Sequence, residues 1–119
     1  MNENTGNVVP VETEGKNAGT GSRPELVVEL YDPYLFEGTE VKEIDLSGLF
    51  DLRALDLCEI DRQMMREGYT GAAMEVTRRY AMLVAARVGK KPWEYCDQMK
   101  ARDCIRIAQA VRTFFYARG

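Results

Sequence analysis

The spacing of apolar residues changes character within one short stretch of the chain, residues 43–57. Its first part alternates between apolar and acidic residues, as does a strand with one buried face. These alternating residues are Glu43, Ile44, Asp45 and Leu46. Beyond the joint at Ser47 and Gly48, apolar residues recur at helical spacing, at Leu57, Ile60 and Met64. The stretch therefore predicts a strand that passes directly into a helix.

Residues 26–46 predict a β-hairpin. Pro33 interrupts the alternation of the first strand, because proline has no N–H to offer a sheet. We therefore expect this strand to be bulged, interrupted or at an edge there. The expected turn is Glu37-Gly38-Thr39, since glycine tolerates a positive φ. Two strands alone are marginal in water, so helices must cover one face.

Apolar stripes downstream predict three longer helices and a short one. The first is expected over about residues 52–67, with Asp51 as its cap, and the second over about residues 72–88. Pro92 is expected to open the short helix, where a missing N–H costs nothing. The last helix is expected over about residues 101–117. The predicted fold class is α+β, an N-terminal β-hairpin packed by three to four α-helices.

Length and composition indicate one domain preceded by an arm. The 119 residues are 45% apolar and 29% charged, as in ordinary globular domains. Residues 1–24 are polar and rich in glycine, so we expect a disordered arm before a domain at residues 25–119. No apolar run approaches the roughly 20 residues of a membrane-spanning helix, and no signal segment begins the chain. We therefore expect a cytoplasmic protein with no membrane partner.

The residues that carry chemistry argue against an enzyme. The chain has no histidine, which removes the commonest general base and metal ligand. Its cysteines, Cys58, Cys96 and Cys104, lack the spacing of a zinc site and are expected to be buried, reduced thiols. Neighbouring acids such as Asp56 and Glu59 fit a solvated helix face better than a two-carboxylate active site. We expect no catalytic residue, no cofactor and no metal.

Charge is divided along the chain. Residues 25–74 carry twelve acids and four bases, a net charge of −8, whereas residues 75–119 carry four acids and ten bases, a net charge of +6. We predict that opposite halves of neighbouring molecules meet head to tail in a weak homo-oligomer, with contacts at Arg78, Arg79 and Arg87. Two alternatives are open. The halves face each other within one fold, or the basic half meets nucleic acid.

The order of motifs resembles that of a known protein family. The residues that carry the resemblance are Asp32-Pro33, Tyr34-Leu35-Phe36-Glu37-Gly38, Val41 to Leu49, Leu55-Asp56-Leu57, Tyr80-Ala81, Pro92, Ala101-Arg102-Asp103, Val111 and Phe114-Phe115. This order is similar to that of the small tail assembly chaperones of long-tailed bacteriophages and prophages, especially those of Gram-positive hosts. It covers residues 26–116. The long arm departs from the family pattern, and so does Arg53-Ala54, where a Ser or Thr cap is expected.

The resemblance implies a tail assembly chaperone. Such a protein binds the tape measure protein, keeps it soluble, assists polymerisation of the tail tube protein around it, and is absent from the mature virion. Aromatic residues that anchor interfaces are the expected contacts, although two of the four are expected to be core instead. These residues are Tyr34, Phe36, Trp93 and Tyr116. The alternatives are a small nucleic-acid-binding regulator that uses the basic helices and a structural head–tail connector subunit.

Overall fold

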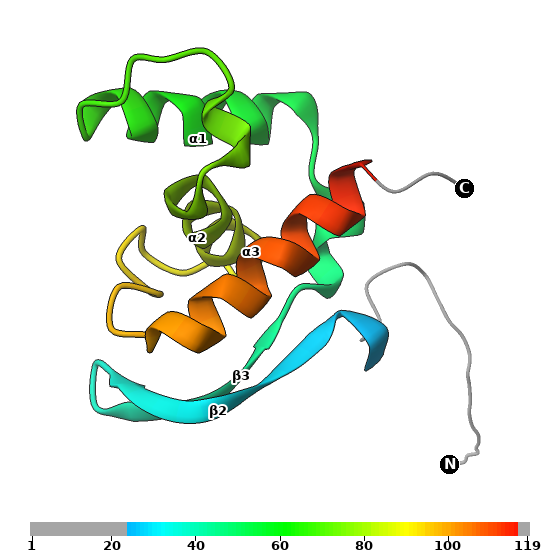
Figure 1. The fold of residues 1–119 in the computed structure, drawn as a ribbon, viewed down its shortest axis with the longest axis vertical. Helices are drawn as coiled ribbons and strands as arrows, with labels where there is room; N and C mark the ends of the chain where they lie inside the picture. Colours follow the sequence, from blue (N-terminus) through cyan, green and yellow to red (C-terminus); the bar gives the residue numbers. More distant parts are fainter. Residues whose placement is uncertain (1–23, 117–119) are drawn as a thin grey trace.

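The computed structural model describes residues 24–116. With η denoting a 3-10 helix, its elements are η1 (Pro24–Leu26), β2 (Val27–Phe36), β3 (Thr39–Asp45), η2 (Ser47–Asp51), α1 (Ala54–Arg66), η3 (Met74–Val76), α2 (Arg78–Val88) and α3 (Ala101–Tyr116). The two strands pair antiparallel, and Figure 1 shows the three α-helices together on one side of the hairpin. The predicted α+β fold is therefore confirmed. The predicted arm lies outside the described residues, apart from Pro24, which begins η1.

A two-residue turn closes the hairpin where the sequence predicts it. Glu37 has a φ of 51° and Gly38 a φ of 82°. Both values lie in the left-handed region that a type I′ turn requires. Glycine adopts this conformation freely, whereas glutamate does so at a cost. The turn leaves Phe36 and Thr39 as the first cross-strand pair.

The first strand bulges at Pro33, as the sequence predicts. The strand register places residues 30–33 of β2 opposite Lys42 alone. Such a bulge bends the strand and increases its twist. The twist changes which side chains of β3 face the core, so that Val41 and Ile44 are both buried although they are three positions apart.

α1 begins later than predicted. Asp51 ends η2 instead of capping a helix, because the chain continues as a 3-10 helix after β3 and is extended at Leu52. The residue before α1 is Arg53, whose N–H donates to Asp56 Oδ2 at 2.9 Å. The predicted Asp51 cap is therefore wrong. The carboxylate of the third helical residue closes this helix end instead.

α2 also begins later than predicted, at Arg78. Ala73 takes a left-handed φ of 66°, which breaks the expected helix, and η3 follows it. The Thr77 hydroxyl then caps α2 by accepting the N–H of Tyr80 at 3.1 Å. The end of α2 at Val88 agrees with the prediction.

The prediction of a short helix at Pro92 is wrong. The N–H of Tyr95 donates to the C=O of Pro92 at 3.0 Å, and two further turns of the same span follow up to Met99. Because each bond spans three residues, the segment is a series of tight turns. α3 then begins at Ala101, as predicted. No helix within residues 24–116 combines the length and the apolar character needed to cross a membrane.

α2 lies at the centre of the core. Figure 1 shows it nearly end-on, between α1, α3 and the hairpin. Its buried residues are Tyr80, Ala81, Leu83, Val84, Ala85 and Ala86. Buried side chains from the other elements surround them, including Leu30, Ile44, Leu46, Leu49, Ile60, Met64, Ile107 and Val111. Full burial of a large apolar side chain stabilises by about 1.5–3 kcal/mol, so these contacts hold the helices against one face of the hairpin.

The cysteines differ from the prediction at one position. Cys96 is buried and Cys104 is half-buried, but Cys58 is exposed on α1 because it lies on the outer face of that helix. Burial raises the pKa of the Cys96 thiol to about 12. This thiol therefore stays protonated near neutral pH and behaves as a small apolar side chain.

Candidate functional site

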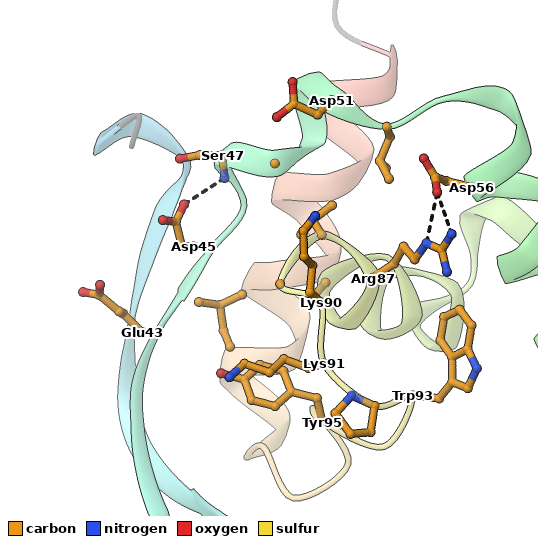
Figure 2. A pocket seen from close by; sticks show the side chains of 17 residues that line it. Glu43, Asp45, Ser47, Asp51, Asp56, Arg87, Lys90, Lys91, Trp93 and Tyr95 are labelled. Atoms are coloured by element: carbon orange, nitrogen blue, oxygen red, sulfur yellow. Dashed lines mark hydrogen bonds and ion pairs between the residues drawn. The ribbon is translucent and has the colours of Figure 1, made fainter. Parts of the chain in front are cut away.

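A groove runs beside β3, between this strand and the connection from α2 to α3 (Figure 2). Its main hollow has a volume of about 910 Å³, with β3 and η2 on one wall and the end of α2 and residues 89–95 on the other. A second hollow of about 450 Å³ continues toward the hairpin turn. The two hollows share Glu43, Lys91, Pro92 and Tyr95. We call them together the β3 groove, which follows the chain from Thr39 to Ser47.

The second wall of the β3 groove follows from how α2 ends. Lys90 has a left-handed φ of 57°, and the N–H of Lys91 donates to the C=O of Ala86 at 2.9 Å. This is a Schellman helix end, in which the left-handed residue is usually glycine. A lysine there carries a conformational cost. The reversal directs the chain back along β3, and Figure 2 shows Lys91 and Tyr95 on the side that faces the strand.

Tyr95 joins the second wall to the hairpin. Its C=O accepts the hydroxyl of Tyr34 at 2.8 Å, and burial raises the pKa of Tyr34, so that hydroxyl stays a donor. The ring of Tyr95 meets Phe36 edge to face, with 5.0 Å between centroids. Lys91 Nζ lies 5.5 Å from the centroid of the same ring. These contacts fix the second wall on β2 and so hold it beside the hairpin.

The two walls carry opposite charges. The acidic side chains are Glu43, Asp45, Asp51 and Asp56, and the basic ones are Arg87, Lys90 and Lys91. Arg87 pairs with Asp56 at 2.7 Å. The N–H of Arg53 and then the guanidinium of Arg87 hold the pKa of Asp56 below its ordinary value. Within residues 24–116, neither lysine forms an ion pair, so no carboxylate of these residues neutralises their charges.

The structure separates the four aromatic residues predicted to bind a partner. Tyr34 is buried behind the second wall, whereas Phe36 is half-buried and lines the second hollow of the β3 groove. Trp93 lines the β3 groove, near Arg87 in Figure 2. Tyr116 is 54% exposed at the end of α3 and does not line the groove. Phe36 and Trp93 therefore line different hollows of the same groove, whereas Tyr116 lies elsewhere and Tyr34 offers a partner little area. A binding role for the others stays a prediction.

Two of the three arginines predicted to join copies of the chain form ion pairs inside the molecule. Arg79 bridges Glu67 and Asp97, at 2.7 and 2.6 Å, and Arg87 pairs across the β3 groove. Arg78 is exposed at the start of α2. The acidic and basic halves therefore face each other within one fold, which was one of the alternatives. The head-to-tail contact stays a prediction, for which Arg78 is the exposed candidate.

Sequence reasoning missed most residues that line the groove. Gly89-Lys90-Lys91-Pro92 has the composition of a helix end followed by a reversal, and that signal marks the second wall. The role of Tyr95 depends on contacts with the distant hairpin and leaves no local pattern. Within residues 24–116, no three His, Cys, Asp or Glu side chains gather as a metal site would require. What the groove offers is hydrogen-bonding backbone, apolar surface and charge, which suit the binding of a polypeptide.

Comparison with protein-family models, with curated proteins and with solved structures gives no match to this chain. The class that the fold and the groove define is a small α+β protein with a groove beside one strand of its hairpin. The resemblance to tail assembly chaperones therefore stays a prediction.

Proposed function

We propose that the chain is a tail assembly chaperone of a long-tailed bacteriophage or prophage. It binds the tape measure protein in the host cytoplasm, keeps it soluble, assists polymerisation of the tail tube protein, and leaves before the virion matures. The observation that carries this proposal is the β3 groove, a hollow of about 910 Å³ with apolar and charged walls beside a strand. The order of motifs from residue 26 to residue 116 supports it.

The lining of the groove suits reversible polypeptide binding. Leu52, Val88 and Trp93 contribute apolar surface, and charged side chains surround them. Apolar contacts provide affinity, whereas charges at the rim set orientation and specificity. A chaperone needs this combination, because it must hold its partner and later release it.

The intramolecular ion pairs weaken the nucleic-acid alternative. Binding to nucleic acid depends on lysine and arginine side chains that are free to neutralise phosphates. Arg79, Arg87 and Arg102 each meet a carboxylate of this chain instead. The basic half therefore presents fewer free charges than its composition indicates.

Co-expression with the tape measure protein tests the proposal. The native chain should move the tape measure protein from inclusion bodies to the soluble fraction. Trp93→Ala should reduce this rescue, because it removes a large aromatic side chain from the main hollow of the groove. Tyr69→Ala, an exposed aromatic residue that does not line the groove, serves as the matched control, and Tyr116→Ala tests the end of α3.

Each variant counts only if its far-UV circular dichroism and its cooperative unfolding in urea match those of the native chain, because each substitution removes an aromatic side chain that contributes to the near-UV spectrum. Failure of the native chain to raise the soluble fraction contradicts the proposed function. Rescue that is reduced by Tyr116→Ala and unchanged by Trp93→Ala moves the binding site from the groove to the end of α3.

A further inference from the structure

The hydrogen-bonding pattern of the hairpin identifies the backbone groups on the outer edge of β3. In an antiparallel pair, alternate residues direct their N–H and C=O groups toward the partner strand, and the others direct them outward. The first pair after the two-residue turn is hydrogen-bonded, so the backbone of Glu40 points outward. At the other end of β3, the N–H of Leu46 donates to the C=O of Leu26 at 2.8 Å. Counted back from Leu46, the alternation directs the backbones of Asp45 and Glu43 outward as well. The alternation is broken between Glu40 and Glu43, opposite the bulge of β2, where Val41 and Ile44 are both buried although they are three positions apart.

α3 binds the corresponding outward groups of β2. Asp103 is fully buried and accepts the N–H groups of Tyr31 and Asp32, each at 2.9 Å. Arg106 donates to the C=O of Glu29 at 2.8 Å. Side chains of α3 therefore close the outer edge of β2 at its bulge, from Glu29 to Asp32.

The outer edge of β3 is open. In the part of the chain that the structure describes, the outward backbone groups of Glu40, Glu43 and Asp45 receive no hydrogen bond. This edge faces the β3 groove. A strand edge with unpaired N–H and C=O groups beside a groove is the arrangement to which an extended peptide adds as a further strand.

Side chains along β3 define the chemistry of such a peptide. Glu43 and Asp45 are exposed, and Figure 2 shows Glu43 pointing away from the helices. Ile44, between them, is buried on the side of the core. An added strand alternates in the same way, and side chains directly opposite each other interact. Its outward-facing residues should therefore be basic, to complement the two carboxylates.

The opposite wall defines the inward-facing residues of the peptide. Val88 and Pro92 offer apolar surface there. Lys90 and Lys91 place two positive charges at the same wall, which disfavours basic residues at inward positions. The inward-facing residues should therefore be apolar.

We propose that β3 accepts an extended segment of a partner protein as a third strand, with basic residues facing outward alternating with apolar residues facing the groove. This inference rests on the proposed function, because the partner is taken to be the tape measure protein. It adds to that function the kind of segment that the groove binds. A second copy of β3 would set Glu43 and Asp45 against the same acids. Residues 1–23 of this chain place Glu12 and Glu14 beside their apolar cluster, which gives a similar repulsion.

A peptide titration of the full, isotope-labelled chain tests this inference by nuclear magnetic resonance. A ten-residue peptide that alternates lysine with valine should shift the amide signals of Glu40, Glu43 and Asp45. A peptide that alternates glutamate with valine should bind about tenfold more weakly, because like charges then face each other. Methylating the peptide nitrogens that face β3 should abolish binding. Methylating the other peptide nitrogens, which face solvent, should leave the dissociation constant within about twofold of that of the unmethylated peptide.

Charge reversal on β3 provides the matched protein variants. Glu43→Lys should weaken binding of the lysine peptide about tenfold and strengthen binding of the glutamate peptide about tenfold. Glu59→Lys makes the same change on α1, outside the groove lining, and should change neither. Equal sensitivity to both sets of methylated nitrogens, or shifts confined to other surfaces, would overturn the strand-acceptor role.

Two other occupants of the groove have distinct signatures in the same titration. If the β3 signals shift with the concentration of the protein alone, the occupant is a second copy. If the peptide displaces contacts between β3 and residues 1–23, the occupant is a segment of this chain. Either result contradicts the inference.

The titration and the co-expression experiment can fail separately. Peptide binding as expected without rescue of the tape measure protein would leave β3 a strand acceptor and refute the chaperone function. Rescue without peptide binding would support the chaperone function and refute the strand-acceptor role.

Discussion

The outer edges of the two strands of the hairpin differ in their hydrogen bonding. β2 is bonded along its bulge by Asp103 and Arg106 of α3, whereas β3 borders an open groove and has no such partner among the described residues. A buried backbone group without a hydrogen bond costs about 1–3 kcal/mol, but one that water reaches costs little. The comparison shows that the fold supplies polar partners where an edge is buried and leaves unpaired the edge that a ligand can approach.

Asp103 shows how strongly the closed edge is held. Burial works to raise the pKa of Asp103, but the N–H groups of Tyr31 and Asp32 and the guanidinium of Arg106 outweigh it and lower the pKa. Two guanidinium groups lie over the ring of Tyr31, that of Arg102 at 4.5 Å and that of Arg106 at 4.3 Å from the ring centroid. The carboxylate and this stacked tyrosine together fix the bulge of β2 on α3.

The largest expected effect comes from opening the closed edge with Asp103→Asn. Asparagine has one acceptor oxygen, so its amide would meet one of the two converging N–H donors. Unfolding in urea should show a loss of about 3 kcal/mol, in the range for breaking a buried charged contact. Asp51→Asn, at an exposed residue of η2, should change stability by less than about 0.5 kcal/mol. A loss of similar size in both variants would contradict the special role of Asp103.

The same residue predicts how stability depends on pH. A carboxyl group whose pKa is lowered by folding stabilises the protein above its unfolded pKa, which is about 4 for aspartate. This stability is lost as the pH falls through the lower pKa of the folded state. The difference in unfolding free energy between the native chain and Asp103→Asn should therefore be constant near neutral pH and shrink below about pH 4. A difference that does not change down to the acid transition would refute this assignment.

A smaller loss of stability is expected from replacing Arg79, whose ion pairs hold the second wall of the groove in place; this is its bracing role. Its guanidinium ties Glu67, after α1, to Asp97 in the turns that follow Trp93. Arg79→Met should cost about 2 kcal/mol, because hydrogen bonds between charged groups are lost. It should also weaken peptide binding at β3. Arg78→Met, at the neighbouring exposed residue, should cost less than about 0.5 kcal/mol, and equal losses in urea unfolding would contradict the bracing role.

The smallest effect is expected at the hairpin turn, and it is a gain. Glu37 has a positive φ in a turn that favours Asn-Gly. Glu37→Asn should stabilise the chain by about 0.5 kcal/mol, because it strengthens the pairing of the two strands. It should leave the outward amides of β3 unprotected from hydrogen exchange, because the open edge is unchanged. Glu40→Asn makes the same change within β3 and should give no gain. Equal stabilisation by the two variants, measured in urea, would show that charge removal and not turn geometry is responsible.

The elements that follow from local patterns could be predicted, and those that follow from distant contacts could not. Alternation, the turn at Gly38 and the bulge at Pro33 are properties of neighbouring residues, and the structure confirms them. The predicted starts of α1 and α2 are too early. Several residues near each start could cap the helix, and local patterns do not show that α1 begins after Arg53 and α2 after Thr77.

The candidate site depends on residues that are far apart in the sequence. Tyr34 meets Tyr95 across 61 positions and Tyr31 meets Asp103 across 72. No spacing rule links such pairs. The open edge of β3 depends in addition on α3 covering β2 instead, which is a property of the tertiary fold. Sequence reasoning therefore found the strand and missed that one of its edges is free.

Native-state hydrogen exchange tests the contrast between the two edges most directly. The amides of Tyr31 and Asp32 should exchange more than about 1,000-fold slower than in an unfolded chain, because their release requires extensive unfolding. The outward amides of Glu40, Glu43 and Asp45 should exchange within about tenfold of the unfolded rate in the free chain, and should become protected when the alternating lysine–valine peptide is added. Strong protection of these three amides in the free chain, or rapid exchange at Tyr31 and Asp32, would contradict the account.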